Sequence, residues 1–201
     1  RADAAQRDRE PRRRGVPGRY TRAMIQLRDA LAENVLQSRD LLKRYLAGFD
    51  DTNLTAQPGG PGGLPNHVAW TLGHLAITMS RAIEKIDGTP PDAGDFFTGE
   101  PRQGDRRRFN TEMVSFGSAP TPEAHQYPPL SRCVEIFDNC CKRLSDKARA
   151  ATDAELEKMV PWGAIQIAGW QVIMRMAFHN GMHTGQIADT RRALRMKSIF
   201  S

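Results

Sequence analysis

Residues Phe178–Leu194 read FHNGMHTGQIADTRRAL and place His179 and His183 four positions apart. On an α-helix, this spacing brings both imidazoles to one face, within reach of a single metal ion. Asn180 follows His179 directly, so the stretch lacks the glutamate that the HExxH metalloprotease motif requires as its general base. The stretch therefore predicts a helical metal site that is not of the protease type.

The apolar spacing around this stretch predicts a helix from about Trp170 to Leu194. The same spacing predicts three more long helices, at about Tyr20–Leu46, Asn66–Ile86 and Leu130–Ala150. Thr152 and Glu155 have the spacing of a capping box, which predicts a short helix after the third long one. With four long helices and no convincing sheet, the sequence predicts an all-α four-helix bundle.

A proline-rich connector, residues 89–129, separates the second and third long helices. Its length permits a crossover along the bundle, in place of a purely short-looped up-and-down arrangement. Two roles stay open for this connector. It either covers the mouth of the site or forms a surface excursion that its aromatic residues hold in place.

Composition and charge narrow the class of protein. The chain has 201 residues, a net charge of +6 and 39% hydrophobic residues, and it contains no apolar run long enough for a membrane helix. Residues 1–19 are rich in arginine, proline and glycine and are predicted to be a disordered basic tail, followed by one bundle domain over residues 20–201. A nucleic-acid arm is disfavoured, because no aromatic residues alternate with the arginines to stack on bases.

The three cysteines, Cys133, Cys140 and Cys141, match no zinc ribbon or CxxC redox motif. The side chains of adjacent cysteines diverge, so that Cys140 and Cys141 are poorly placed to pair with each other. We expect buried free thiols, as in proteins of a reducing cytoplasm.

His74 is a third candidate ligand, in the middle of the second predicted helix among apolar residues. A lone histidine in such a place is more often a core residue with one hydrogen bond. Bundles nevertheless build metal sites from inward side chains of facing helices. Three neutral imidazoles with one open position suit Zn²⁺, Ni²⁺ or Fe²⁺.

Several neighbours of the histidines are candidates for supporting roles. Gln186 lies one turn after His183, and either Gln186 or Asn180 is placed to orient a ligand or to bind metal-bound water. The alternative is an ordinary interhelix or cap-like contact, which is favoured over a site role for Asn180. Trp70 is expected in the core or in the wall of a pocket. The sequence identifies no convincing general base, so the catalytic residues stay unassigned.

Gly181 and Gly185 lie beside the two histidines of the last helix. Glycine costs a helix interior about 1 kcal/mol relative to alanine. Two such residues predict the close approach of a neighbouring helix or a ligand.

Two motifs resemble the DinB/YfiT-like family: WTLGHLA at residues 70–76 and HNGMHTGQIADTRRAL at residues 179–194. The resemblance implies that His74, His179 and His183 are metal ligands in a four-helix bundle with a crossover, often a homodimer. It also implies a relation to S-transferases and isomerases that use low-molecular-weight thiols such as bacillithiol or mycothiol.

The first functional hypothesis is therefore a metal-dependent transferase that activates such a thiol for attack on a small electrophile. The second is a metal-dependent hydrolase that activates water. The third is a non-catalytic, dimeric bundle that binds a metal or a small molecule. No membrane or nucleic-acid partner is expected.

Overall fold

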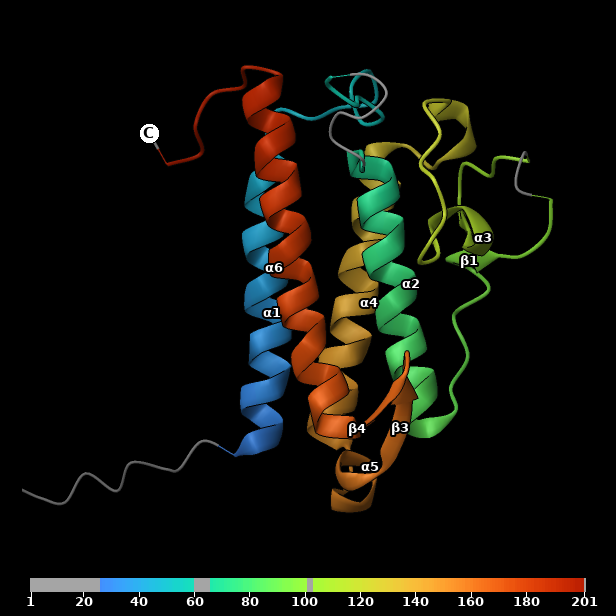
Figure 1. Cartoon of the computed structure of the whole chain (residues 1–201), viewed down its shortest axis with the longest axis vertical. Coiled ribbons are helices and arrows are strands. Elements are labelled where there is room, and N and C mark those ends of the chain that lie inside the picture. The colour runs from blue at the N-terminus through green and yellow to red at the C-terminus, as the bar shows by residue number, and fades with distance from the viewer. Residues whose placement is uncertain (1–25, 60–65, 101–102, 201) are drawn as a thin grey trace, which may run out of the picture.

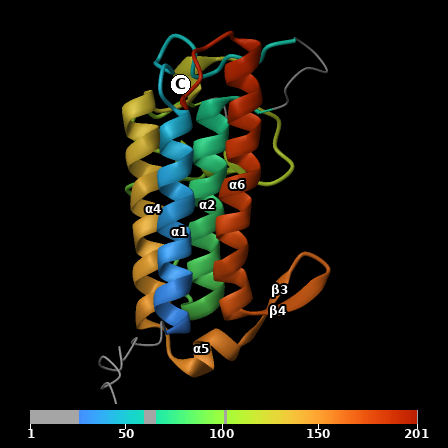
Figure 2. The same cartoon turned by 90° about the vertical axis from the view of Figure 1, so that its left-hand side faces the viewer.

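The structure is a computed structural model that describes residues 26–59, 66–100 and 103–200. Four long helices lie side by side along the molecule (Figures 1 and 2). They are α1 (Leu27–Tyr45), α2 (Val68–Asp87), α4 (Leu130–Ala150) and α6 (Gly169–Ala193). Each corresponds to a helix predicted from the apolar spacing, and the bounds of α4 agree at both ends. The predicted four-helix bundle is confirmed, whereas the predicted tail at residues 1–19 lies outside the described residues.

The order of the helices in space differs from their order in the chain. α1 packs against α4 and α6, and α2 packs against the same two helices, so that α1 and α2 occupy opposite corners. The colours of Figure 1 show that α1 and α6 run in one direction and α2 and α4 in the other. α2 and α6 are therefore antiparallel neighbours, and the candidate site forms between them.

The long connector between α2 and α4 is a crossover that returns beside α2 (Figure 1). It carries two paired two-residue strands and two short helical turns: β1 (Phe96–Phe97), β2 (Phe109–Asn110), α3 (Thr111–Val114) and a 3₁₀ turn (Ala124–Gln126). The side chains of Phe96 and Phe109 are buried, and buried Asp95 forms ion pairs of 2.9 and 2.6 Å with Arg132 and Arg143 of α4. Aromatic burial and these ion pairs fix the connector against the bundle.

A hairpin precedes α6 and was not anticipated as a paired structure. The predicted capping box of Thr152 and Glu155 begins α5 (Asp153–Glu157). The antiparallel strands β3 (Met159–Trp162) and β4 (Ile165–Ala168) follow, and Gly163 turns the chain between them at a φ of 61°. Strands of four residues leave little periodicity to detect in a sequence, which is why no hairpin was predicted there.

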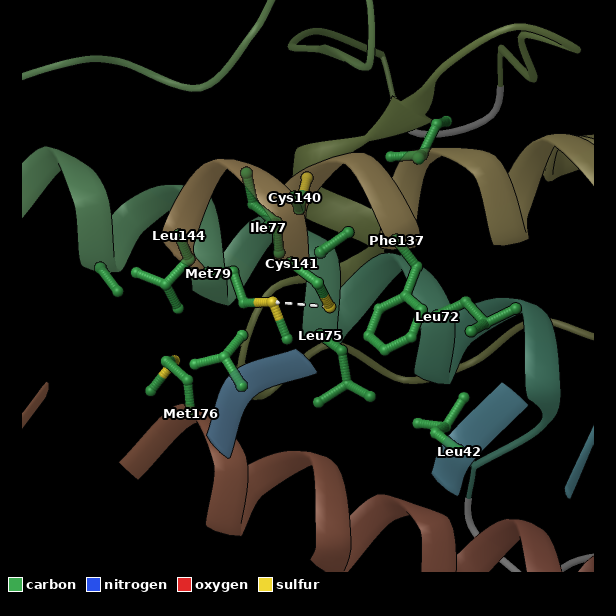
Figure 3. Close-up of a cluster of buried hydrophobic side chains, with 14 of the residues drawn as sticks. Leu42, Leu72, Leu75, Ile77, Met79, Phe137, Cys140, Cys141, Leu144 and Met176 are labelled. Atoms are coloured by element: carbon green, nitrogen blue, oxygen red, sulfur yellow. Dashed lines mark hydrogen bonds between the residues drawn. The ribbon is translucent and has the colours of Figure 1, made fainter. Parts of the chain in front are cut away.

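The core contains all three cysteines as free, fully buried thiols. Figure 3 shows Cys140 and Cys141 among leucines and methionines, with the Sγ atom of Cys141 3.4 Å from the Sδ atom of Met79. Burial raises the pKa of Cys140 to about 11 and also raises the pKa values of Cys133 and Cys141. These groups are structural thiols and not nucleophiles at neutral pH.

α2 begins at Val68, two residues after the predicted bound at Asn66. Its N-cap is His67: the Nδ1 atom of His67 accepts a hydrogen bond of 3.1 Å from the backbone N–H of Trp70. Its Nε2 atom lies 2.8 Å from the carbonyl oxygen of Thr121 and donates to it. No described helix is long and apolar enough to cross a membrane.

Candidate metal centre

Three histidine nitrogens meet between α2 and α6. The Nε2 atom of His179 lies 3.2 Å from that of His74 and 3.1 Å from that of His183. His74 comes from α2, and the other two come from successive turns of α6. One potential ligand atom from each histidine lies within 4.8 Å of those of the other two. The structure thus brings together the three residues that the sequence selected.

The outer nitrogens fix how two of the rings are protonated. The Nδ1 atom of His74 lies 2.9 Å from the carbonyl oxygen of Val114, and the Nδ1 atom of His183 lies 2.8 Å from Oε1 of Gln186. Both oxygens only accept hydrogen bonds, so each Nδ1 atom carries the proton. The Nε2 atoms of His74 and His183 therefore point lone pairs at the centre of the site.

This donor set fits a divalent transition metal. If Nε2 of His179 carries a proton, it can donate a hydrogen bond to only one of the two lone pairs that face it, which belong to His74 and His183. A metal ion would instead accept a lone pair from each of the three histidines. Bond lengths of about 2.0–2.1 Å in a tetrahedral site place ligand nitrogens about 3.3 Å apart, close to the two separations observed here. Imidazole ligands suit zinc, nickel and iron alike.

The protonation equilibria favour the metal-binding form of each ring. Burial, with the charges of the neighbouring histidines, lowers the pKa of His179 to about 3 and that of His183 to about 4. Burial also lowers the pKa of His74, and the charge of Arg81 contributes to that shift. All three rings are therefore neutral at pH 7, which is the state that ligates metals.

Gly73 makes room for the carbonyl group that orients His74. A Cβ atom at Gly73 would lie 2.7 Å from side-chain atoms of both Phe109 and Val114. Without it, the connector packs directly on α2, and the carbonyl oxygen of Val114 reaches His74. The glycine of the GHL sequence is thus part of the support of the site.

Trp70 and Gln186 each contact one of the histidines of the site. The indole ring of Trp70 stacks on His74 with a centroid distance of 4.5 Å and an interplanar angle of 10°. Its Nε1 atom donates to Oγ of Ser118 at 3.0 Å. Oε1 of Gln186 accepts a second hydrogen bond, from Nδ2 of Asn66 at 3.0 Å, which fixes its orientation toward His183.

Asn180 does not belong to the site. It is fully buried on the side of α6 that faces α1, where its Nδ2 atom donates to Oγ of Ser38 at 2.9 Å. Consecutive helical residues point about 100° apart, so the residue after His179 turns away from it.

The expected close approach of a neighbouring helix at the two glycines of α6 is wrong, whereas the approach of a ligand stays a prediction. Apart from the chain neighbours and the nearby backbone of α6 itself, no described atom lies within 4 Å of a Cβ built on Gly181 or Gly185. Both residues face open space.

A pocket of about 810 Å³ opens beside the histidines. His74 and His179 line its inner end, whereas His183 is buried behind them. The remaining wall is largely apolar, and no aspartate or glutamate is among the described residues that line it. Phe116 of the connector, Trp162 of the hairpin and Phe178 of α6 contribute the large aromatic surfaces.

Some parts of the site could not be found from the sequence. Val114 acts through its main chain, which gives no signal in the choice of residue.

Other residues of the site had a signal in the sequence that was not used. Thr78, Arg81 and Lys85 line the pocket and lie four, seven and eleven positions after His74. That spacing keeps them on the His74 face of α2 and was available as a signal.

Several solved structures share this fold, and two of them are compared with it here. A conserved protein from Enterococcus faecalis is 14% identical, with a TM-score of 0.62 over 85% of this chain and 98% of its own. YfiT from Bacillus subtilis is described as a probable metal-dependent hydrolase with an unusual four-helix bundle topology. It is 15% identical, with a TM-score of 0.57 over 88% of this chain and 93% of its own. At these identities, the likeness concerns the fold alone.

The sequence itself was compared with families and with curated proteins. No curated protein matches it. A family model described as the DinB superfamily matches residues 8–187, which include all three histidines and all of the bundle except the last six residues of α6. This chain belongs to the DinB superfamily.

Proposed function

We propose that the chain is a metal-dependent transferase in which an ion held by His74, His179 and His183 activates a low-molecular-weight thiol. One observation carries the proposal: three histidine Nε2 atoms converge beside a pocket that His74 and His179 line and that is large enough for small substrates. Three ligands leave a position for a nucleophile.

The protein residues hold the site and do not transfer protons. The Nδ1 protons of His74 and His183 are engaged by Val114 and Gln186, and the Nε2 atoms face the centre. A divalent transition metal bound there supplies a Lewis acid that lowers the pKa of a thiol or water in its open position. Because the ligands are neutral, the charge of the ion is fully available for this effect.

The composition of the pocket favours a thiol over water. Hydrolysis by a general base needs a group poised to take a proton from water, and no carboxylate lines the described pocket wall. A thiol ionises more readily than water and needs no such group. Its proton leaves to solvent, a carbon–sulfur bond forms with the electrophile, and the bond from that carbon to its leaving group breaks.

A metal-dependent hydrolase is the second candidate. It is favoured by the fold relative YfiT, which is described as a probable metal-dependent hydrolase. The same three histidines serve this chemistry, with water in place of the thiol.

Turnover assays separate these functions. The zinc- or nickel-loaded protein is mixed with a panel of thiols and the chromogenic electrophile 1-chloro-2,4-dinitrobenzene, and separately with nitrophenyl esters without thiol. The proposal predicts thiol-dependent turnover that is lost in His179→Ala and retained in His125→Ala, since His125 is exposed and lies outside the site.

Turnover of the esters without thiol would support the hydrolase and contradict the transferase. Metal binding without any turnover would contradict both and support the non-catalytic binding protein. The homodimer and the cytoplasmic location stay predictions that rest on the family resemblance and on the free cysteines.

A further inference from the structure

Three cationic side chains line the outer part of the pocket. Arg81 and Lys85 follow His74 on α2 by seven and eleven residues, and Arg175 precedes His179 on α6 by four. Because α2 and α6 are antiparallel, all three cations lie toward the same end of the bundle, on the hairpin side of the histidines (Figure 1). The pocket thus runs from the three-histidine site toward a cluster of positive charge.

These cations lack the neutralising partners that the fold supplies elsewhere. Asp95 pairs with Arg132 and Arg143. Asp138 likewise forms ion pairs with Arg39, Lys43 and Lys142. Among the residues that the structure describes, no hydrogen bond or ion pair engages the side chain of Arg81, Lys85 or Arg175. Their charge is available to a ligand.

The rest of the pocket wall would receive an apolar body. Trp162 and Met174 line it, and Phe116, Phe178 and Met182 expose 93%, 69% and 57% of their surfaces around it. Large apolar side chains left in water at the edge of a pocket are typical of a binding site. A ligand that covers these side chains removes apolar surface from water, which favours binding.

The helix positions set the distance between the two ends of such a ligand. At 1.5 Å per residue, Arg81 lies about 10 Å along α2 from His74, and Arg175 about 6 Å along α6 from His179. A molecule that reacts at the histidines and reaches these cations therefore extends along the bundle toward the hairpin.

We infer that the electrophilic substrate is an organic carboxylate with an apolar body, whose carboxylate is bound by Arg81 and Arg175 with Lys85 beside them. Guanidinium groups match a carboxylate with two parallel hydrogen bonds. This inference rests on the proposed function for the reaction, but the binding of the carboxylate is a property of the pocket alone.

Calorimetric binding of octanoate and its uncharged analogue octanamide tests the inference. Both probes are titrated into the full chain, free of metal and loaded with zinc. We expect octanoate to bind at least about tenfold more tightly than octanamide. Arg81→Gln and Arg175→Gln should each remove several-fold of that preference and leave octanamide affinity unchanged, which also shows that the variants are folded.

Arg195→Gln is the matched control, because it removes the same charge from an exposed position beyond the far end of α6. It should keep the full preference for octanoate. An octanoate affinity no greater than that of octanamide, including no detectable binding of either, would overturn the inference. So would an equal loss of preference in Arg195→Gln.

The outcome is separable from that of the proposed function, because binding is measured without turnover. A preference for octanoate without thiol transfer would contradict only the transferase. Thiol transfer without the preference would contradict only the carboxylate pocket.

Discussion

Oε1 of Gln186 lies 2.8 Å from Nδ1 of His183 and accepts a hydrogen bond from its N–H, so that a residue one turn further along α6 sets which nitrogen of His183 faces the site. Asn66, just before α2, donates to the same oxygen at 3.0 Å. The hydrogen-bond chain joins the two helices that carry the ligands. Gln186 thus orients the candidate ligand His183 without being one of the three candidate metal ligands itself.

Gln186→Ala should weaken zinc binding by about 10- to 100-fold, the range found when such outer partners of histidine ligands are removed. Affinity is measured by competition with a chromogenic chelator. Gln37→Ala is the control, because among the described residues the side chain of Gln37 bonds only Glu33, on the exposed side of α1. Unchanged zinc affinity in Gln186→Ala would show that the glutamine has no orienting role.

Gly73→Ala should lower the free energy of unfolding by about 1–3 kcal/mol, the cost of an added methyl group in a packed interior. The new Cβ atom would meet Phe109 and Val114 at 2.7 Å and displace the carbonyl that orients His74. Denaturant unfolding measures the stability, and zinc affinity should fall as well.

Gly181→Ala is the matched control, since no described atom lies within 4 Å of its added Cβ. It should raise the free energy of unfolding by about 0.5–1 kcal/mol, through the better helix propensity of alanine. If both glycine variants had the same stability, the packing of the connector on Gly73 would not matter.

The metal-free protein should lose stability as the pH falls from about 6.5 to 4. The unfolded chain protonates these histidines near their ordinary pKa of 6.5, whereas burial lowers the pKa of His179 to about 3 and that of His183 to about 4. In that window the unfolded state binds more protons, so acid favours unfolding.

Each such histidine contributes at most about 1.4 kcal/mol per pH unit to the slope. Urea unfolding across the window should show a smaller slope for His183→Asn than for wild type, and no change for exposed His125→Gln. A stability that stays constant from pH 6.5 to 4.5 would contradict the burial of neutral histidines.

Much of this site could be predicted because its signals are local. Helical spacing placed His179 and His183 on one face, and the apolar surroundings of His74 placed it inside the bundle. The spacing of Thr152 and Glu155 likewise predicted α5. Each of these inferences depends on residues within a few turns of one another.

The parts that could not be predicted depend on contacts between distant segments. The carbonyl of Val114 reaches His74 across 40 positions of chain, and the amide of Asn66 reaches Gln186 across 120. Asn180 makes an interhelix contact, but its partner Ser38 lies 142 positions away on α1 and could not be identified from the sequence. Residue type alone does not reveal which of two helix neighbours such a side chain faces.

Elemental mass spectrometry on protein purified without an affinity tag, combined with thermal melting, tests the metal site most directly. Wild type and His125→Ala should bind about one zinc or nickel ion per chain and gain melting temperature with added metal, because the ion binds only the folded state. His183→Ala should bind none and gain nothing. Wild type without bound ion, together with a His183→Ala variant that melts like it with and without added zinc or nickel, would contradict the three-histidine metal site.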